Sequence, residues 1–267
     1  MKKVAVLIPT YKPGSYFEEC LQSLDKQTLS KKHFTVYIAL NGPKENFEKY
    51  IKKILLNYTF NYNYYYIKTP GVSNARNFLL DVSTEEFVTF IDDDDLVSDN
   101  YLKMLLLEAG DSYMSVSNVK NFSESLETQT ENYIGKSFNT IQYIELSKFK
   151  TRKFYSSPWG KLIHRNIIGN VKFNCNLSIG EDSLFMAEIS NNVIGLCKAH
   201  DSVCYFVRER EGSATRTKIK RYKELKRIFY LLFVYSKMLF TPKYGKFFII
   251  SRIVATLKHF EKLIRVE

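Results

Sequence analysis

The chain has 267 residues, of which 45% are hydrophobic and 25% charged, a composition typical of a globular protein with a substantial core. Its four cysteines form no C-x-x-C pair and have no histidine at zinc spacing, which excludes a zinc-finger class and favours reduced thiols in a cytoplasmic protein. The first residues lack a signal-peptide core, and no apolar run approaches the roughly 18 residues that span a bilayer.

The net charge of +11 is concentrated at one end of the sequence. Residues 216–267 contain 14 lysines and arginines against three acidic residues, which accounts for the whole excess and leaves the first 215 residues neutral overall. We therefore predict two parts, a domain over residues 1–215 and a basic segment over residues 216–267.

The first part of the chain alternates between strand and helix patterns. In chain order we expect a strand at 4–8, a helix at 15–24, a strand at 34–40, a helix at 45–57, a strand at 62–67, a helix at 73–81 and a strand at 87–91. This alternation predicts an α/β fold with a mostly parallel, Rossmann-like sheet flanked by helices. No strand leads into a G-x-G-x-x-G or P-loop motif, so the standard dinucleotide and P-loop sites are not indicated.

Four aspartates, Asp92 to Asp95, follow the last of these strands. On an extended backbone Asp92 and Asp94 would share one side, and Asp93 and Asp95 the other. Crowded carboxylates at the carboxyl end of a strand suit a hard divalent cation, Mg²⁺ or Mn²⁺, which binds one or two protein carboxylates together with substrate phosphates. The alternative is an acidic, solvated turn that leads into a helix.

The second half of the sequence is less regular. We expect a strand at 113–119, a loop at 121–135, a helix at 139–148, a helix that starts after Gly180 and ends near residue 191, and a strand at 203–207. Beyond residue 215, apolar residues recur at helical spacing with Lys and Arg on the other faces, and Pro242 and Gly245 interrupt the pattern. Two such basic helices suit an anionic membrane surface; alternatively they pack on the domain or on a second copy of the chain.

Several polar and aromatic residues of this half are candidate site residues. Trp159, the only tryptophan, is either a core anchor or part of a substrate pocket. Glu181 and Asp182 begin a helix, where carboxylates suit the helix dipole and where one could instead act as a general base. The stretch after the last strand could close over a diphosphate or be a solvated connector, and its candidate donors are Arg208, Arg210 and Ser213.

Four motifs together resemble the family 2 glycosyltransferases, an inverting group with the GT-A fold. The resemblance runs from Val4 to about Arg216 and is carried by VLIPTY at 6–11, GVSNARN at 71–77, FIDDDD at 90–95 and GED at 180–182. Each motif alone is a weak signal. Their order, each at the end of a strand or the mouth of a helix, makes the combined signal specific.

The resemblance implies a role for each matching residue. Asp182 would be the catalytic base, and Asp94 would hold the metal, Mn²⁺ or Mg²⁺, on the donor diphosphate. Trp159 and Lys161 would lie on the acceptor side, with Glu181 beside them. The nucleotide side would be formed by Pro9, Thr10, Tyr11, Arg76, Asp92 and Asp93.

One position departs from the family pattern. The family usually carries Asp-Asp-Gly-Ser after its second strand, with an aspartate that reads the nucleotide base, whereas this chain has Leu40-Asn41-Gly42-Pro43. Asn41 has both a donor and an acceptor but no charge, so recognition of a uracil base by this residue is an open point.

The implied activity is transfer of a sugar from a UDP-sugar to a hydroxyl of a glycan or a polyprenyl-diphosphate-linked acceptor, in polysaccharide synthesis at the inner face of the membrane. A nucleotidyltransferase is the chief enzymatic rival, but it would show a Gly-rich, Arg-containing loop after the first strand, and residues 9–14 are not such a loop. A nucleic-acid-binding protein is the second rival. It is disfavoured because the basic segment has no recognisable RNA-binding motif.

Overall fold

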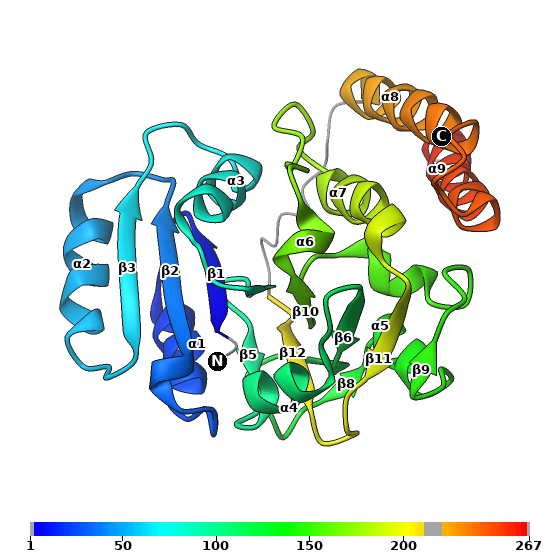
Figure 1. Cartoon of the computed structure of the whole chain (residues 1–267). Helices are drawn as coiled ribbons and strands as arrows, with labels where there is room; N and C mark the ends of the chain where they lie inside the picture. Colours follow the sequence, from blue (N-terminus) through cyan, green and yellow to red (C-terminus); the bar gives the residue numbers. More distant parts are fainter. Residues whose placement is uncertain (1–2, 211–220, 266–267) are drawn as a thin grey trace.

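The computed structural model describes residues 3–210 and 221–265 and has a central eight-stranded sheet (Figure 1). Its first four strands are parallel, β10 runs antiparallel to both of its neighbours, and β6 and β11 are again parallel. In spatial order the strands are β3 (Asn61–Tyr66), β2 (Phe34–Leu40), β1 (Val4–Thr10), β4 (Phe87–Phe90), β10 (Lys161–His164), β6 (Tyr113–Val116), β11 (Gly195–Lys198) and β9 (Ile144–Glu145). The expected α/β fold with a mostly parallel sheet is confirmed.

Three helices connect the parallel strands of the first half: α1 (Ser15–Asp25), α2 (Glu45–Leu55) and α3 (Val72–Val82). All seven residues of β1 are buried, as expected for a continuous apolar run at the centre of a sheet covered on both faces. α2 buries only the side that carries Ile51, Ile54 and Leu55. The alternation of strand and helix expected from the sequence is confirmed here.

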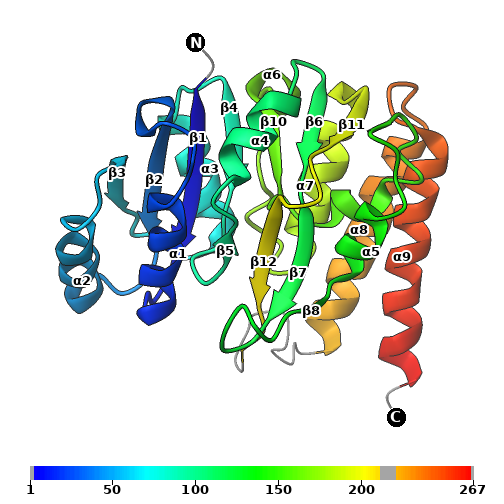
Figure 2. The same ribbon diagram turned by 90° about the horizontal axis from the view of Figure 1, so that it is seen from below.

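A smaller second sheet lies next to the part of the first sheet that contains β10 and β6, below it in Figure 2. Its strand order is β5 (Leu96–Val97), β12 (Cys204–Arg208), β7 (Asn118–Phe122) and β8 (Thr130–Glu131). The expected single strand at 113–119 was wrong, because β6 and β7 are separated at Ser117 and pair in different sheets. The remaining short elements are α4 (Tyr101–Glu108), α6 (Arg165–Ile168), α7 (Glu181–Ile189) and three 3₁₀ turns at Lys31–His33, Arg152–Ser156 and Ser190–Asn192.

The expected loop at 121–135 is confirmed only for residues 123–129, because residues 130–131 are extended and a helix begins at residue 133. The expected helix at 139–148 was wrong. The helix of this region, α5 (Tyr133–Phe138), comes earlier, because Asn132 caps it by accepting a hydrogen bond of 2.8 Å from the backbone N–H of Ile134. The residues expected to be helical are extended at β9, which pairs with β11. Tertiary pairing outweighs the local helical pattern in this segment.

The basic C-terminal segment forms two antiparallel helices, α8 (Arg221–Leu239) and α9 (Lys246–Arg265), at one side of the molecule (Figures 1 and 2). One face of the pair joins the main hydrophobic core through Leu231, Tyr235, Met238, Phe248 and Ile249. The ring of Phe248 lies 4.9 Å from that of Tyr155, measured between centroids. The helices therefore pack on the domain, one of the alternatives expected from the sequence. Within the described residues, no helix is long and apolar enough to cross a bilayer.

Candidate functional site

A cavity of about 840 Å³ lies at the carboxyl ends of β1, β2 and β4, where the loops that follow these strands converge. Its wall is completed by the residues before α3, the start of α7 and one face each of α8 and α9. Ligands bind beyond the carboxyl ends of strands in open α/β sheets, so this is where a site is expected. Pro9, Thr10, Tyr11, Asn41 and Arg76 all contribute to the lining.

The aspartate run forms a turn rather than an extended strand, because the backbone N–H of Asp95 bonds the carbonyl of Asp92 at 3.1 Å. Asp92, Asp93 and Asp94 therefore all line the cavity, and the expected alternation of sides was wrong. Asp95 is buried and accepts a hydrogen bond of 2.8 Å from the backbone of Arg208. It supports the turn instead of facing a ligand.

Burial makes these carboxylates hard to ionise together. Burial raises the pKa of Asp93 to about 7 even though its carboxylate accepts a hydrogen bond from the Thr10 hydroxyl. The pKa of Asp94 is raised by burial and by the neighbouring Asp92, and the pKa of Asp95 is raised well above its usual range by the same two causes. A cluster of this kind is stabilised by a proton or by a cation.

Two arginines at the end of β12 contact the aspartate turn: Arg208, the last residue of the strand, and Arg210, two residues beyond it. The Nε atom of Arg210 lies 2.6 Å from a carboxylate oxygen of Asp94, and Arg210 lines the cavity. Arg208 is buried; its Nε donates to the backbone carbonyl of Asp94 at 2.9 Å, and its Nη2 pairs with Glu19 at 2.5 Å. Arg208 thus holds the turn and Arg210 faces the ligand space. Ser213 lies outside the described residues.

Arg76 of α3 joins the two carboxylate groups of the site. Its side chain is only 3% exposed; Nη2 lies 2.9 Å from Asp92, and Nη1 pairs with Asp182. Burial would lower the pKa of Arg76, but the two carboxylates together raise it. A fully ionised guanidinium therefore fixes the aspartate turn relative to the start of α7.

Asp182 opens into the cavity with 23% of its side chain exposed. Burial raises the pKa of this carboxyl to about 7, against the effect of Arg76. Its neighbour Glu181 also lines the cavity and has a pKa raised by burial. A carboxylate whose pKa lies near neutral pH, and which has one side open to a cavity, is suited to accept a proton.

Gly180 sets the position of Asp182. Its φ of +87° is a left-handed conformation, and a Cβ there would lie 3.1 Å from a methyl of Leu231. α8 therefore packs directly on the turn that begins α7. Gly42, after β2, allows the backbone to approach the residues that follow β1, because a Cβ at Gly42 would lie only 1.9 Å from the carbonyl oxygen of Tyr11.

Trp159 and Lys161 are not among the residues that line the cavity. Trp159 stacks on Tyr205 with ring centroids 5.0 Å apart, and Lys161 is buried, with Nζ donating to the carbonyls of Ser157 and Trp159 at 2.6 Å each. Burial lowers the pKa of Lys161 to about 7. These two residues hold the backbone before β10.

Asn41 keeps one polar atom without a protein partner. Its Nδ2 donates to the carbonyl of Gly71 at 2.7 Å, whereas its buried Oδ1 has no hydrogen-bond partner. A buried acceptor without a partner is unfavourable, which indicates that a ligand donor fits beside it.

The residues that α8 and α9 add to the cavity were not anticipated from the sequence. They include Arg227, Leu231 and Tyr235 of α8 and Arg252, Thr256 and His259 of α9. The signal that could have found them is the spacing of the last three, which puts a cation on the face of α9 that packs inward.

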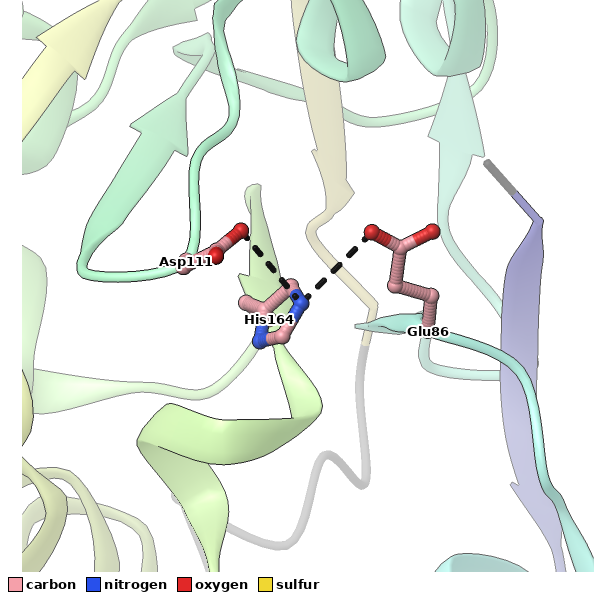
Figure 3. A group of neighbouring side chains, drawn as sticks. All are labelled: Glu86, Asp111 and His164. Carbon is pink, nitrogen blue, oxygen red and sulfur yellow. Dashed lines mark ion pairs between the residues drawn. The ribbon is translucent and has the colours of Figure 1, made fainter. Parts of the chain in front are cut away.

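A second group of titratable side chains, Glu86, Asp111 and His164, lies at the other end of β4 (Figure 3). Nε2 of His164 is 3.6 Å from Glu86 and 3.7 Å from Asp111. Nδ1 accepts a hydrogen bond from the backbone of Asn166, so Nε2 carries the proton of the neutral ring and has no free lone pair for a metal. This arrangement favours electrostatic contacts between the ring N–H and the two carboxylates over metal binding.

Comparison with known proteins agrees with this geometry. The family model for glycosyl transferase family 2 matches residues 5–172. Glycosyltransferase GlyA of Streptococcus pneumoniae is 26% identical over 230 residues, covering 80% of this chain and 32% of GlyA. The poly(ribitol-phosphate) beta-N-acetylglucosaminyltransferase TarS of Staphylococcus aureus is 23% identical, covering 79% of this chain and 36% of TarS. The chain thus spans about a third of these curated relatives.

Solved structures show the same architecture. A crystal structure of TarS residues 1–349 with UDP-GlcNAc superposes with a TM-score of 0.78 at 19% identity, covering 99% of this chain and 76% of that one. The mannosyltransferase PcManGT of Pyrobaculum calidifontis, with GDP-Man and Mn²⁺, has a TM-score of 0.64 at 13% identity, covering 99% and 76%. The chain belongs to glycosyl transferase family 2 and has the GT-A fold of a glycosyltransferase.

Proposed function

We propose that the chain is a metal-dependent, inverting glycosyltransferase that moves a sugar from a UDP-sugar to a hydroxyl of a glycan or lipid-linked acceptor in cell-surface polysaccharide synthesis. The observation that carries this proposal is the double contact of Arg76 with Asp92 and Asp182. Through it, the aspartate turn and a carboxylate with a pKa of about 7 face one cavity. A donor diphosphate and an acceptor hydroxyl would meet between them.

The nucleotide base would lie between Tyr11 and Asn41. The free Oδ1 of Asn41 is an acceptor, and uracil presents an N–H donor at N3, so the two are complementary. Cytosine has no N–H at that ring position and could donate to the acceptor only through its exocyclic amine. The UDP-GlcNAc in the TarS structure is consistent with a uridine nucleotide in this fold.

The aspartate turn fits a divalent cation. Asp92, Asp93 and Asp94 offer hard oxygen ligands at the cavity wall, and burial raises the pKa values of Asp93 and Asp94. Asp94 would hold Mn²⁺ or Mg²⁺ with Asp92 nearby. When bound, the ion neutralises charge on the leaving diphosphate. Arg210, beside Asp94, would bind the same phosphates.

Asp182 would act as the general base. It removes the proton of the acceptor hydroxyl as that oxygen forms a bond to the anomeric carbon and the bond from that carbon to the diphosphate breaks. Attack from the face opposite the leaving group inverts the configuration. The ion pair with Arg76 orients the carboxylate and stabilises its ionised form.

The outer face of the C-terminal helix pair would bind an anionic membrane surface on its cytoplasmic side. Phe229 and Phe233 of α8 are exposed. Phe240, between the two helices, and Phe247, the second residue of α9, are exposed as well. The same segment carries the whole net positive charge of the chain. Exposed aromatics with surrounding cations are typical of interfacial helices and would bring the site to a lipid-linked acceptor.

Incubation of the chain with a panel of nucleotide sugars and Mn²⁺ or Mg²⁺ tests the proposal. We expect slow release of UDP from a UDP-sugar, loss of that release on addition of EDTA, and none with Asp94→Ala. Absence of nucleoside diphosphate release or binding from every donor would contradict it. Release of pyrophosphate from a nucleoside triphosphate and a sugar phosphate would instead indicate a nucleotidyltransferase.

A further inference from the structure

Arg252 of α9 differs from the other arginines of the cavity. Among the described residues, Arg76, Arg210 and Arg227 also line it, and each pairs with a carboxylate: Asp92 and Asp182, Asp94, and Glu224, respectively. Arg252 is only 9% exposed, and no acidic side chain within the described parts of the chain forms an ion pair with it.

The contacts of Arg252 leave donors free. Nη2 donates to the backbone carbonyl of Arg152, the guanidinium lies 5.0 Å from the ring centroid of Phe248, and Nε is buried without a hydrogen-bond partner. A guanidinium carries five N–H donors and stays charged in proteins, so burial without an anion is unfavourable. An anion in the cavity beside Arg252 would satisfy both the unpartnered Nε and the unpaired charge.

Arg252 lies on the side of the cavity where the proposed base lies. The phenol of Tyr133 shares a hydrogen bond of 2.6 Å with Ser156, which lines the cavity. Tyr235 of α8, which also lines the cavity, shares a hydrogen bond of 3.3 Å with Ser183, the residue that follows Asp182. The donor diphosphate already has Arg210 at the aspartate turn. An anion at Arg252 therefore belongs to the acceptor.

We propose that Arg252 binds a phosphate group of the acceptor, so that the acceptor is a phosphate-bearing molecule, either a phosphodiester polymer or a prenyl diphosphate-linked glycan. This inference rests on the proposed glycosyltransferase function and names the substrate class of its second site. A neutral glycan would leave the charge of Arg252 without a partner. The phosphate would direct a nearby hydroxyl of the same molecule towards Asp182.

Titration calorimetry on the intact chain, loaded with UDP and Mn²⁺, tests the binding separately from transfer. The probes are a short glycerol-phosphate oligomer, geranyl diphosphate and, as the uncharged control, glycerol. We expect at least one phosphate probe to bind and glycerol not to bind. The phosphate probe that binds identifies the source, polymer or lipid-linked, and binding of neither would overturn the proposal.

Three variants locate the phosphate. Arg252→Met should weaken the bound probe at least tenfold, whereas Lys258→Met, which removes the same charge from an exposed position of α9, should leave it unchanged. Equal losses in both variants would show non-specific charge attraction and overturn the assignment. If Arg252→Met does not fold, Arg252→Lys carries the test, since lysine keeps the charge but not the forked donors.

The kinetic readout separates this inference from the function on which it rests. In Arg252→Met, KM for the phosphate acceptor should rise at least tenfold, whereas in Lys258→Met it should not change. A chain that hydrolyses no nucleotide sugar refutes the proposed function itself. A chain that hydrolyses the donor normally but shows no change in acceptor KM on loss of Arg252 refutes only the phosphate subsite.

Discussion

Arg76 shows how one residue organises the site. Its guanidinium is almost fully buried and bridges Asp92, which follows β4, and Asp182, which is 90 positions later in the chain. Each carboxylate would be costly to bury alone, and the arginine offsets that cost for both. The position of the proposed base is thereby tied to the position of the nucleotide side.

Asp182→Asn should abolish transfer and leave the fold intact. The amide has almost the same shape but cannot accept a proton from the acceptor, and loss of general-base assistance typically lowers kcat by about 10²–10⁴-fold. Transfer is measured by UDP release with acceptor present, and folding by circular dichroism and UDP binding. Near-normal kcat in the variant would remove Asp182 from this role.

The rate of transfer should depend on pH through Asp182. A base must be deprotonated, and burial raises the pKa of this carboxyl to about 7, so kcat/KM should fall as pH drops below 7 and level off above it. Glu188 of α7 also has a pKa raised by burial but does not line the cavity, so Glu188→Gln serves as the control and should keep the same profile. A profile that is flat from about pH 5.5 to 8.5 would contradict the assignment.

At the scale of elements, the site depends on the close packing of α8 against the turn before α7. Gly180 has a φ of +87° and faces Leu231, while Arg227 of the same helix lies alongside. A side chain at this position would meet both a backbone penalty and a steric one. The packing of α8 against Gly180 therefore constrains the position of the proposed base, Asp182.

Gly180→Ala should lower the free energy of unfolding by about 1–2 kcal/mol and reduce transfer, since a left-handed conformation is unfavourable for alanine and Asp182 is two residues away. Gly14→Ala is the matched control, because its φ is −127° and a Cβ there meets nothing within 4 Å. Urea unfolding measures both. Equal stability of the two variants would show that the turn tolerates a side chain.

At the scale of the molecule, α8 and α9 have two faces with different roles. The inner face joins the main core and the cavity wall, and the outer face exposes aromatic side chains. The proposed membrane-binding surface and the cavity are thus formed by the same two helices, which would place an acceptor bound at that surface near the site.

The chain should float with liposomes that contain anionic lipid and not with neutral liposomes. Phe233→Ser combined with Phe240→Ser should reduce flotation at least fivefold, because each aromatic contributes apolar area to an interface. Leu56→Ser combined with Leu107→Ser, which removes exposed apolar residues elsewhere, is the control. Concentration-dependent dimerisation without flotation would assign this face to a second copy of the chain.

Local patterns in the sequence were sufficient for the first half of the fold. Buried parallel strands such as β1 are continuous apolar runs, and the helices between them have the period of an amphipathic helix, so short-range information determines them. The same approach failed at 113–148, where β6 and β7 enter different sheets and β9 is stabilised by pairing with β11. Pairing partners far along the chain decide such segments.

The sequence by itself was sufficient to identify the family and to predict the basic C-terminal helices, because contiguous motifs carry both. It also identified the aspartate run and Asp182 as candidate site residues. Only the tertiary structure decided that Arg76 bridges Asp92 and Asp182, that Lys161 is buried away from the cavity lining, and that Arg252 lines the cavity with no carboxylate from the described residues paired to it. These facts depend on which distant side chains share a desolvated space. Which charged side chains pair, and which are buried, depends on the neighbours that folding brings together, and the spacing of residues along the chain does not show it directly.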